Sequence, residues 1–137
     1  KNEKKNLKLH MVGKLQSNKA KDAFEVFDYI HSLDTQKLAD IFSKCENNSS
    51  KKLNYFIQVN LGKEPQKSGI AVSNLDSFYN YCTKENNLNI IGLMIIPPNN
   101  QNPLNLLLTY LFLLTDYRFP HHQPFLLLYL EQLNVIL

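Results

Sequence analysis

The chain has 137 residues, 44% of them hydrophobic, which fits a globular domain with its own core. The formal net charge is +3, and the positive charge is concentrated in the first 21 residues, where seven lysines accompany one glutamate. A nucleic-acid-binding segment would combine such lysines with arginines or with aromatics that stack on bases, and neither occurs here. We therefore predict a solvated lysine-rich face and no nucleic-acid partner.

The first predicted element is a strand over residues 7–12, whose side chains alternate between two faces. Gly13 ends it, because glycine accepts the backbone conformations of a sharp turn. Residues 16–24 are then predicted to form a helix with Ser17 or Asn18 as its N-cap. A strand, a glycine turn and a helix favour ligand binding at the C-terminal end of the strand, although many such turns bind nothing.

Three more strands are predicted at residues 28–34, 53–61 and 88–96, and the last stops at Pro97, which cannot donate to a ladder. A helix lies between each pair of strands. The first of these helices follows a cap at Asp34 or Thr35, and its apolar residues fall on one stripe: Leu38, Ile41, Phe42 and Cys45. The second begins at Ser73 or Asn74 and repeats this spacing.

This alternation of strands and helices predicts an α/β fold with a parallel sheet built from βαβ units. The pattern alone leaves open a closed barrel or an open doubly wound sheet. No Gly-x-Gly-x-x-Gly sequence follows any of the predicted strands, which argues against a dinucleotide-binding sheet.

The character of the chain changes after residue 103. Residues 104–114 and 125–137 are rich in leucine and nearly free of charge. Each run is too short for a helix that spans a bilayer, which needs about 20 apolar residues. We therefore predict a domain over residues 1–103, a leucine-rich tail over residues 104–137 and no membrane span.

Neither the cysteines nor the histidines of the chain predict a metal site. Cys45 and Cys82 are far apart and lack metal-ligand spacing, so we expect two reduced thiols. His121 and His122 are adjacent, but they have no third ligand nearby in the sequence. With no signal peptide in the chain, we predict a cytoplasmic protein.

Four stretches of the chain carry a family resemblance in a fixed order. They are His10-x-x-Gly13-x-Leu15-Gln16-Ser17-Asn18-Lys19, Ile30-His31-Ser32-Leu33-Asp34, Gln58-Val59-Asn60 with Lys67-Ser68-Gly69, and Gly92-Leu93-Met94-Ile95-Ile96-Pro97. Together they resemble the pyridoxal phosphate homeostasis proteins, a branch of the alanine racemase N-terminal-domain superfamily. Leu9 replaces the aromatic that is usual in this family, and Ala23 replaces a larger aliphatic residue.

The resemblance implies a TIM (β/α)8 barrel that binds pyridoxal 5′-phosphate (PLP), with the four predicted strands as strands three to six of eight. Such a barrel usually needs about 250 residues, so we expect an incomplete chain. In the family a lysine on the first strand forms a Schiff base with PLP, and segments after the seventh and eighth strands bind its phosphate. The matched stretches include neither part, and the unmatched tail suggests a truncated or frame-disrupted reading, or a divergent tail.

The candidate cofactor-binding residues lie where predicted strands end, because barrel sites form at the C-terminal ends of strands. They are His10, Val12, Gly13, Asn60, Lys67 and Met94. Lys67 corresponds to a basic residue that faces the phenolic oxygen of the cofactor in related racemases. For each of these residues a packing or surface role is the alternative. Without the covalent lysine, we expect the chain to bind PLP weakly or not at all.

We therefore predict a non-enzymatic carrier or buffer of PLP, present here as part of its barrel. One alternative is a piece of a PLP-dependent amino-acid racemase, which would need a second acid or base opposite the lysine. Another alternative is an interaction module that docks a partner through the leucine-rich tail. A partial barrel leaves open sheet edges, so we also expect the chain to self-associate.

Overall fold

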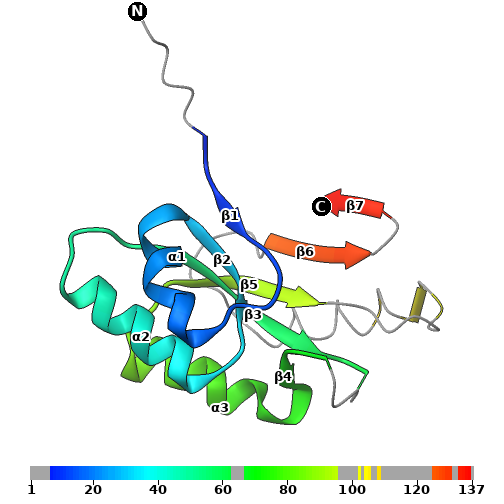
Figure 1. The fold of residues 1–137 in the computed structure, drawn as a ribbon. Coiled ribbons are helices and arrows are strands. Elements are labelled where there is room, and N and C mark those ends of the chain that lie inside the picture. Colours follow the sequence, from blue (N-terminus) through cyan, green and yellow to red (C-terminus); the bar gives the residue numbers. More distant parts are fainter. Residues whose placement is uncertain are drawn as a thin grey trace, which may run out of the picture.

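A computed structural model of the chain describes residues 7–62 and 67–95, residues 102, 104, 105 and 108, and the backbone of residues 125–130 and 133–136. Strands and helices alternate along the chain (Figure 1). In order they are β1 (His10–Met11), η1 (Ser17–Lys19), α1 (Ala20–Val26), β2 (Tyr29–Leu33), α2 (Gln36–Asn47), β3 (Asn54–Asn60), β4 (Ile70–Ala71), η2 (Val72–Asn74), α3 (Leu75–Asn80), η3 (Tyr81–Glu85), β5 (Ile90–Ile95), β6 (Phe125–Leu130) and β7 (Leu133–Ile136).

All the described strands belong to one sheet, in which β1, β2, β3, β5, β6 and β7 follow each other as neighbours and β4 pairs with β3. The pairs β1–β2, β2–β3, β3–β5 and β5–β6 are parallel, which confirms the expected βαβ arrangement. Only β7 runs antiparallel, against β6. No secondary structure was predicted for the leucine-rich tail, so β6 and β7 are additions to the predicted sheet. The division of the chain into domains at residue 103 stays a prediction.

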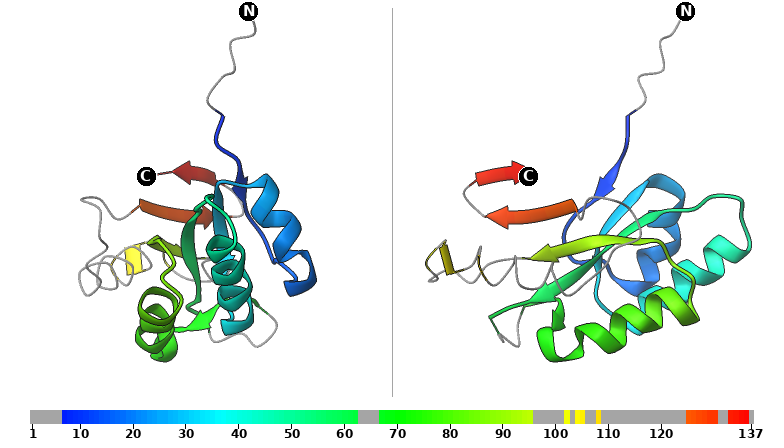
Figure 2. Two further views of the ribbon diagram at one scale, coloured as in Figure 1. Left: turned by 90° about the vertical axis from the view of Figure 1, so that its left-hand side faces the viewer. Right: turned by 180° about the vertical axis from the view of Figure 1, so that it is seen from behind.

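The helices α1, α2 and α3 cover one face of the sheet (Figures 1 and 2). The helix α2 has the predicted stripe, and its N-cap Thr35 accepts a hydrogen bond from the backbone of Leu38 at 3.2 Å. Leu38 and Phe42 are buried there against alternate side chains of the strands. These apolar contacts between helix and sheet form the core, whose strand side comprises Ile30, Leu33, Tyr55, Ile57, Val59, Ile90, Leu93 and Ile95.

The first strand and the first helix differ from the prediction. β1 has two residues, because only His10 and Met11 pair with β2, at Tyr29 and Ile30. The predicted helical start is a 3-10 turn, η1, and neither it nor α1 has a side-chain cap. Ser17 and Asn18 are therefore not the caps that the sequence predicted.

A buried carboxylate fixes the connection between α2 and β3. Glu46 is 4% exposed, and its Oε1 accepts hydrogen bonds from the Leu53 backbone and from the Tyr55 hydroxyl, both at 2.9 Å. Lys52 forms an ion pair with its other oxygen at 3.2 Å. Burial raises the pKa of Tyr55, and the charge of Glu46 raises it further. The buried carboxylate is thus hydrogen-bonded and paired, as a buried charge must be.

The parallel strands place the segments that follow them at one edge of the sheet. Gly13 follows β1, Asp34 follows β2, and Asn60 ends β3. A parallel sheet, as predicted from the sequence, places the ends of its strands in this way. Pro97, which was expected at the same edge, lies outside the described residues.

No helix in the described part of the chain is long and apolar enough to cross a bilayer. Among the same residues, no three histidines, cysteines or acidic residues gather as metal ligands. Cys45 and Cys82 are free thiols, and burial, with the charge of Asp40, raises the pKa of Cys82 to about 12. His121 and His122 lie outside the described residues.

Candidate functional site

The face of the sheet away from the helices carries polar side chains in the middle of apolar strands. Phe56 and Gln58 alternate along β3 with core residues, and Met94 alternates with core residues along β5. Met94 and Gln58 are partners in the register of these two strands. We call this surface the inner face, because it would face the interior of a barrel whose helices lie outside.

Two histidines from neighbouring strands form a direct contact on the inner face. Nδ1 of His10, in β1, lies 2.8 Å from Nε2 of His31, in β2. The His10 ring stacks on Tyr29 with a centroid distance of 4.2 Å, and the His31 ring stacks on Phe56 at the same distance. His10 is exposed, whereas His31 is only 2% exposed. Hydrogen bonding and ring stacking together hold both imidazoles across three strands.

Burial is the main cause of an unusual pKa at His31. The loss of hydration of the buried ring is the larger cause and the charge of the nearby His10 is the smaller one. Together they lower this pKa from 6.5 to about 4. At neutral pH His31 is therefore uncharged and carries one ring proton.

Three buried polar atoms have no hydrogen-bond partner in the described part of the structure: His31 Nδ1, Ser32 Oγ and Gln58 Oε1. All three residues are at most 2% exposed. Buried polar atoms in folded proteins usually have a partner. The strands β2 and β3 thus contain hydrogen-bonding capacity that the described residues do not use.

Three side-chain hydrogen bonds attach residues 67–69 to the ends of β2 and β3. Asn60 Nδ2 donates to the Lys67 carbonyl at 3.2 Å, and Gln58 Nε2 donates to the Ser68 carbonyl at 3.3 Å. The Gly69 N–H donates to Asp34 Oδ2 at 3.1 Å. Burial raises the pKa of Asp34, although this hydrogen bond and the charge of Lys14 oppose the effect. The three bonds place Lys67 beside the C-terminal ends of the strands.

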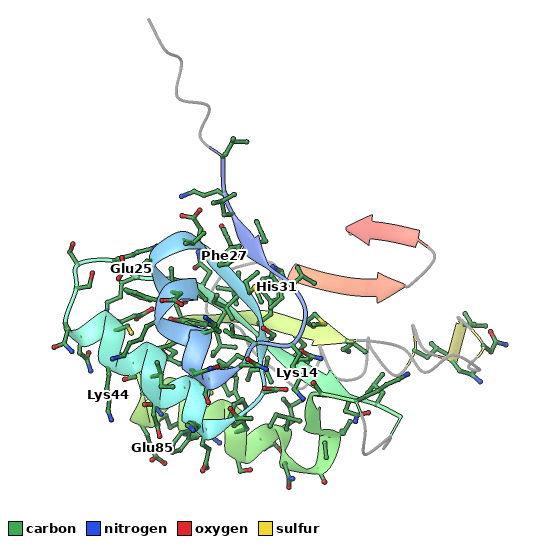
Figure 3. The ribbon with its side chains drawn as sticks, viewed as in Figure 1. Lys14, Glu25, Phe27, His31, Lys44 and Glu85 are labelled. Atoms are coloured by element: carbon green, nitrogen blue, oxygen red, sulfur yellow. The ribbon has the colours of Figure 1, made fainter. Side chains whose placement is uncertain are left out.

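A cleft of about 630 Å³ lies at this edge, between the start of η1, the start of α2 and residues 67–69. Three cations line it, namely Lys14 (labelled in Figure 3), Lys37 and Lys67, whereas Asp34 is the one acidic residue among the described residues that line it. The cleft is therefore positively charged, and it lies at the end of the parallel sheet where ligands bind in barrels.

The predicted site residues lie in three places: three residues at β1, two near the end of β3 and one buried in β5. His10, Val12 and Gly13 are exposed at β1, and Gly13 has the positive φ of +95° that its turn requires. Asn60 and Lys67 are half-buried and joined by their hydrogen bond. Met94 is only 1% exposed, so it lies beneath the surface of the inner face. The role of these residues in cofactor binding stays a prediction.

The candidate list from the sequence missed His31, Gln58 and Asp34. His31 and Gln58 each interrupt an apolar strand, and a polar residue inside such a strand indicates a second, polar face. Asp34 is the first residue after β2, where a parallel strand presents its site. These two signals were available in the sequence, although neither identifies the partner of each side chain.

A family model described as "Alanine racemase, N-terminal domain" matches residues 3–107. The chain belongs to the alanine racemase N-terminal domain family. Among relatives in this family, a pyridoxal phosphate homeostasis protein of Aquifex aeolicus is 37% identical over 97 residues, which are 71% of this chain and 42% of the relative. The corresponding protein of Escherichia coli is 35% identical over 91 residues, which are 66% of this chain and 39% of the relative. The chain thus spans about two fifths of the length of these relatives.

Solved structures show the same family fold. PipY of Synechococcus elongatus without PLP is similar with a TM-score of 0.72 and 30% identity, over 81% of this chain and 53% of that protein. PipY with PLP bound is similar with a TM-score of 0.71 and 28% identity, over 82% and 53%. These matches confirm the predicted fold, a parallel α/β sheet that forms part of the barrel of the alanine racemase N-terminal domain family.

Proposed function

We propose that this chain is part of a non-enzymatic protein that binds PLP and acts as its carrier or reservoir in the cytoplasm. The names of its relatives support this role, and so does the PLP bound to the similar PipY structure. Bound PLP supplies a reactive aldehyde and an electron-withdrawing ring. None of the relatives and solved structures named above is described as a racemase. The leucine-rich tail, on which the interaction-module alternative rests, lies mostly outside the described residues.

The histidine pair is the observation that carries the proposal. His10 is exposed beside Tyr29, the first residue of β2, yet its orientation is fixed by the Tyr29 ring and by the buried His31. A pre-oriented polar side chain in such a place is typical of a ligand site, because a ligand then gains a hydrogen bond without ordering the side chain.

The other candidate residues fit the remaining parts of PLP. Val12 offers an exposed apolar surface to a flat ring, and Asn60 and Lys67 offer an amide and a cation to ring oxygens or the phosphate. Met94 supports the wall from below. The three unpartnered polar atoms of β2 and β3 agree with a site that accepts a polar ligand.

We expect this chain by itself to bind PLP weakly. The segments that carry the covalent lysine and the phosphate-binding residues of the family are not among the stretches that match. Multiple charged hydrogen bonds to the phosphate are the strongest contacts available to such a ligand, and the wall residues each contribute only about 1 kcal/mol.

Equilibrium dialysis with PLP tests this function directly. We expect weak binding to the chain and about fivefold weaker binding to His10→Ala, the effect of one lost hydrogen bond. Lys44→Ala is the matched control, since Lys44 is an exposed lysine of α2 on the helical side of the sheet. Equal binding by the wild-type chain and His10→Ala would contradict the site. Formation of D-alanine from L-alanine and PLP would contradict the non-enzymatic role.

A further inference from the structure

The contact between His10 and His31 requires that one ring nitrogen donates a proton and the other accepts it. The two nitrogens are 2.8 Å apart, which is hydrogen-bond distance. His31 is uncharged at neutral pH because it is buried. Its single ring proton therefore lies either on Nε2, which faces His10, or on Nδ1.

The environment of His31 Nδ1 decides between these two forms. This atom is buried and has no partner among the described residues. A buried N–H without an acceptor is among the rarest arrangements in folded proteins, whereas an unused acceptor is better tolerated. The form with the proton on Nε2 leaves only an unused acceptor in the interior, and it places the donor opposite His10.

We propose that His31 is a positioning residue that donates from Nε2 to His10 Nδ1 and thereby fixes His10 as a hydrogen-bond donor through its own Nε2. A neutral imidazole that accepts at Nδ1 must carry its proton on Nε2. Because His10 is exposed, this N–H is presented to a ligand. The stacks of His10 on Tyr29 and of His31 on Phe56 keep both rings in this orientation.

The consequence of this inference for ligand binding rests on the proposed function. It specifies the kind of ligand atom that His10 contacts. That atom must be a hydrogen-bond acceptor, such as an oxygen of the phenol, aldehyde or phosphate of PLP. A protonated nitrogen cannot occupy the position, because two donors would then face each other.

The positions of the ring protons can be measured on the cofactor-free chain by long-range ¹H–¹⁵N NMR of the histidine rings. We expect a protonated Nε2 and an unprotonated Nδ1 in both His10 and His31 at neutral pH. A proton on His10 Nδ1, or signals of His10 averaged over both nitrogens, would overturn the proposal. This measurement needs no ligand, so it decides the proposal even if the chain fails to bind PLP.

Two variants separate positioning from packing. His31→Phe keeps a ring against Phe56 but removes the donor, so the His10 signals should become averaged and PLP binding should weaken about fivefold. His31→Gln restores an amide donor and should restore both properties. Equal signals of His10 in the wild type and in a folded His31→Phe would overturn the proposal. Should His31→Phe fail to fold, the proton positions in the wild-type chain remain decisive.

Discussion

The carboxylate of Asp34 accepts a hydrogen bond from the backbone N–H of Gly69 at 3.1 Å, which joins the end of β2 to the residue that precedes β4. The two residues are 35 positions apart in the sequence. A Cβ atom added to Gly69 would lie 2.8 Å from the backbone nitrogen of Asn60, so the two segments meet in close backbone contact. The positively charged cleft depends on this contact, because Asp34, Lys67, Ser68 and Gly69 all line it.

Gly69→Ala should therefore destabilise the chain more than Gly13→Ala. Both glycines have a positive φ, +123° and +95°, which costs an alanine about 1 kcal/mol. Only Gly69 also meets backbone atoms, so we expect a total loss of about 2 kcal/mol or more there. Urea unfolding of both variants measures the difference. Equal losses would show that the contact between Gly69 and β3 is looser than the structure shows.

The buried Glu46 should contribute more to stability than any of its partners. Glu46→Ala leaves the Leu53 N–H and the Tyr55 hydroxyl without an acceptor, and we expect it to lower the free energy of unfolding by about 3 kcal/mol. Tyr55→Phe removes only one hydrogen bond and should cost about 1 kcal/mol. Lys52→Ala removes an exposed partner and should cost less than about 1 kcal/mol. A different order in urea unfolding would contradict this account.

The low pKa of His31 makes stability depend on pH. In the unfolded chain His31 binds a proton as the pH falls through 6.5, whereas the folded chain resists until about pH 4. The free energy of unfolding should therefore decrease as the pH falls from 6.5 to 4, and this loss should be complete below pH 4. Each unit of pKa shift corresponds to about 1.4 kcal/mol of stability. Because water screens the effect of the exposed His10, we expect the total loss of unfolding free energy to be about 2 kcal/mol.

His31→Phe is the control for this dependence, because other groups of the chain also titrate in the same range. Urea unfolding of both proteins at a series of pH values isolates the contribution of His31 as their difference. A constant difference between pH 6.5 and 4 would show that His31 is not held neutral by burial.

The edge strand β1, which lies at one side of the sheet, should promote self-association. Within the described residues β1 has one neighbouring strand, β2, and Leu7 and Leu9 beside it are 73% and 47% exposed. An open strand edge with exposed apolar side chains favours pairing with another chain. Light scattering after size-exclusion chromatography should show oligomers that Leu9→Lys reduces. Val72→Lys is the control, since Val72 is 42% exposed but belongs to η2. A monomeric wild-type chain would refute the prediction.

The sequence predicted β2, β3, β5 and α2 closely, because these elements have apolar runs or stripes with clear ends at Asp34, Asn60 and Asn47. It overestimated β1, since alternation shows which side chains share a face and not whether a partner strand is present. The strands β6 and β7 were missed because short leucine-rich runs fit a buried strand or a buried helix equally well.

The site was predicted in part. The glycine turn and the strand ends indicated Gly13, which follows β1, and Asn60, which ends β3, whereas His10 pairs with Tyr29, the first residue of β2, and so lies toward the N-terminal ends of the strands. The contact of His10 with His31 depends on the register that pairs His10 with Tyr29, and no local pattern specifies that register. The bond between Asp34 and Gly69 likewise arises from the meeting of β4 with β3, which only the folded chain shows.

Titration of the ¹⁵N-labelled chain with PLP, followed by ¹H–¹⁵N NMR, shows whether these residues form one PLP site. We expect the same binding curve for the shifting signals of five residues: His10, Val12, Gly13, Asn60 and Lys67. Signals of exposed residues of α2 such as Lys44 should stay unchanged. Shifts confined to the helices, or no shift at millimolar PLP, would contradict a cofactor-binding wall formed by these residues.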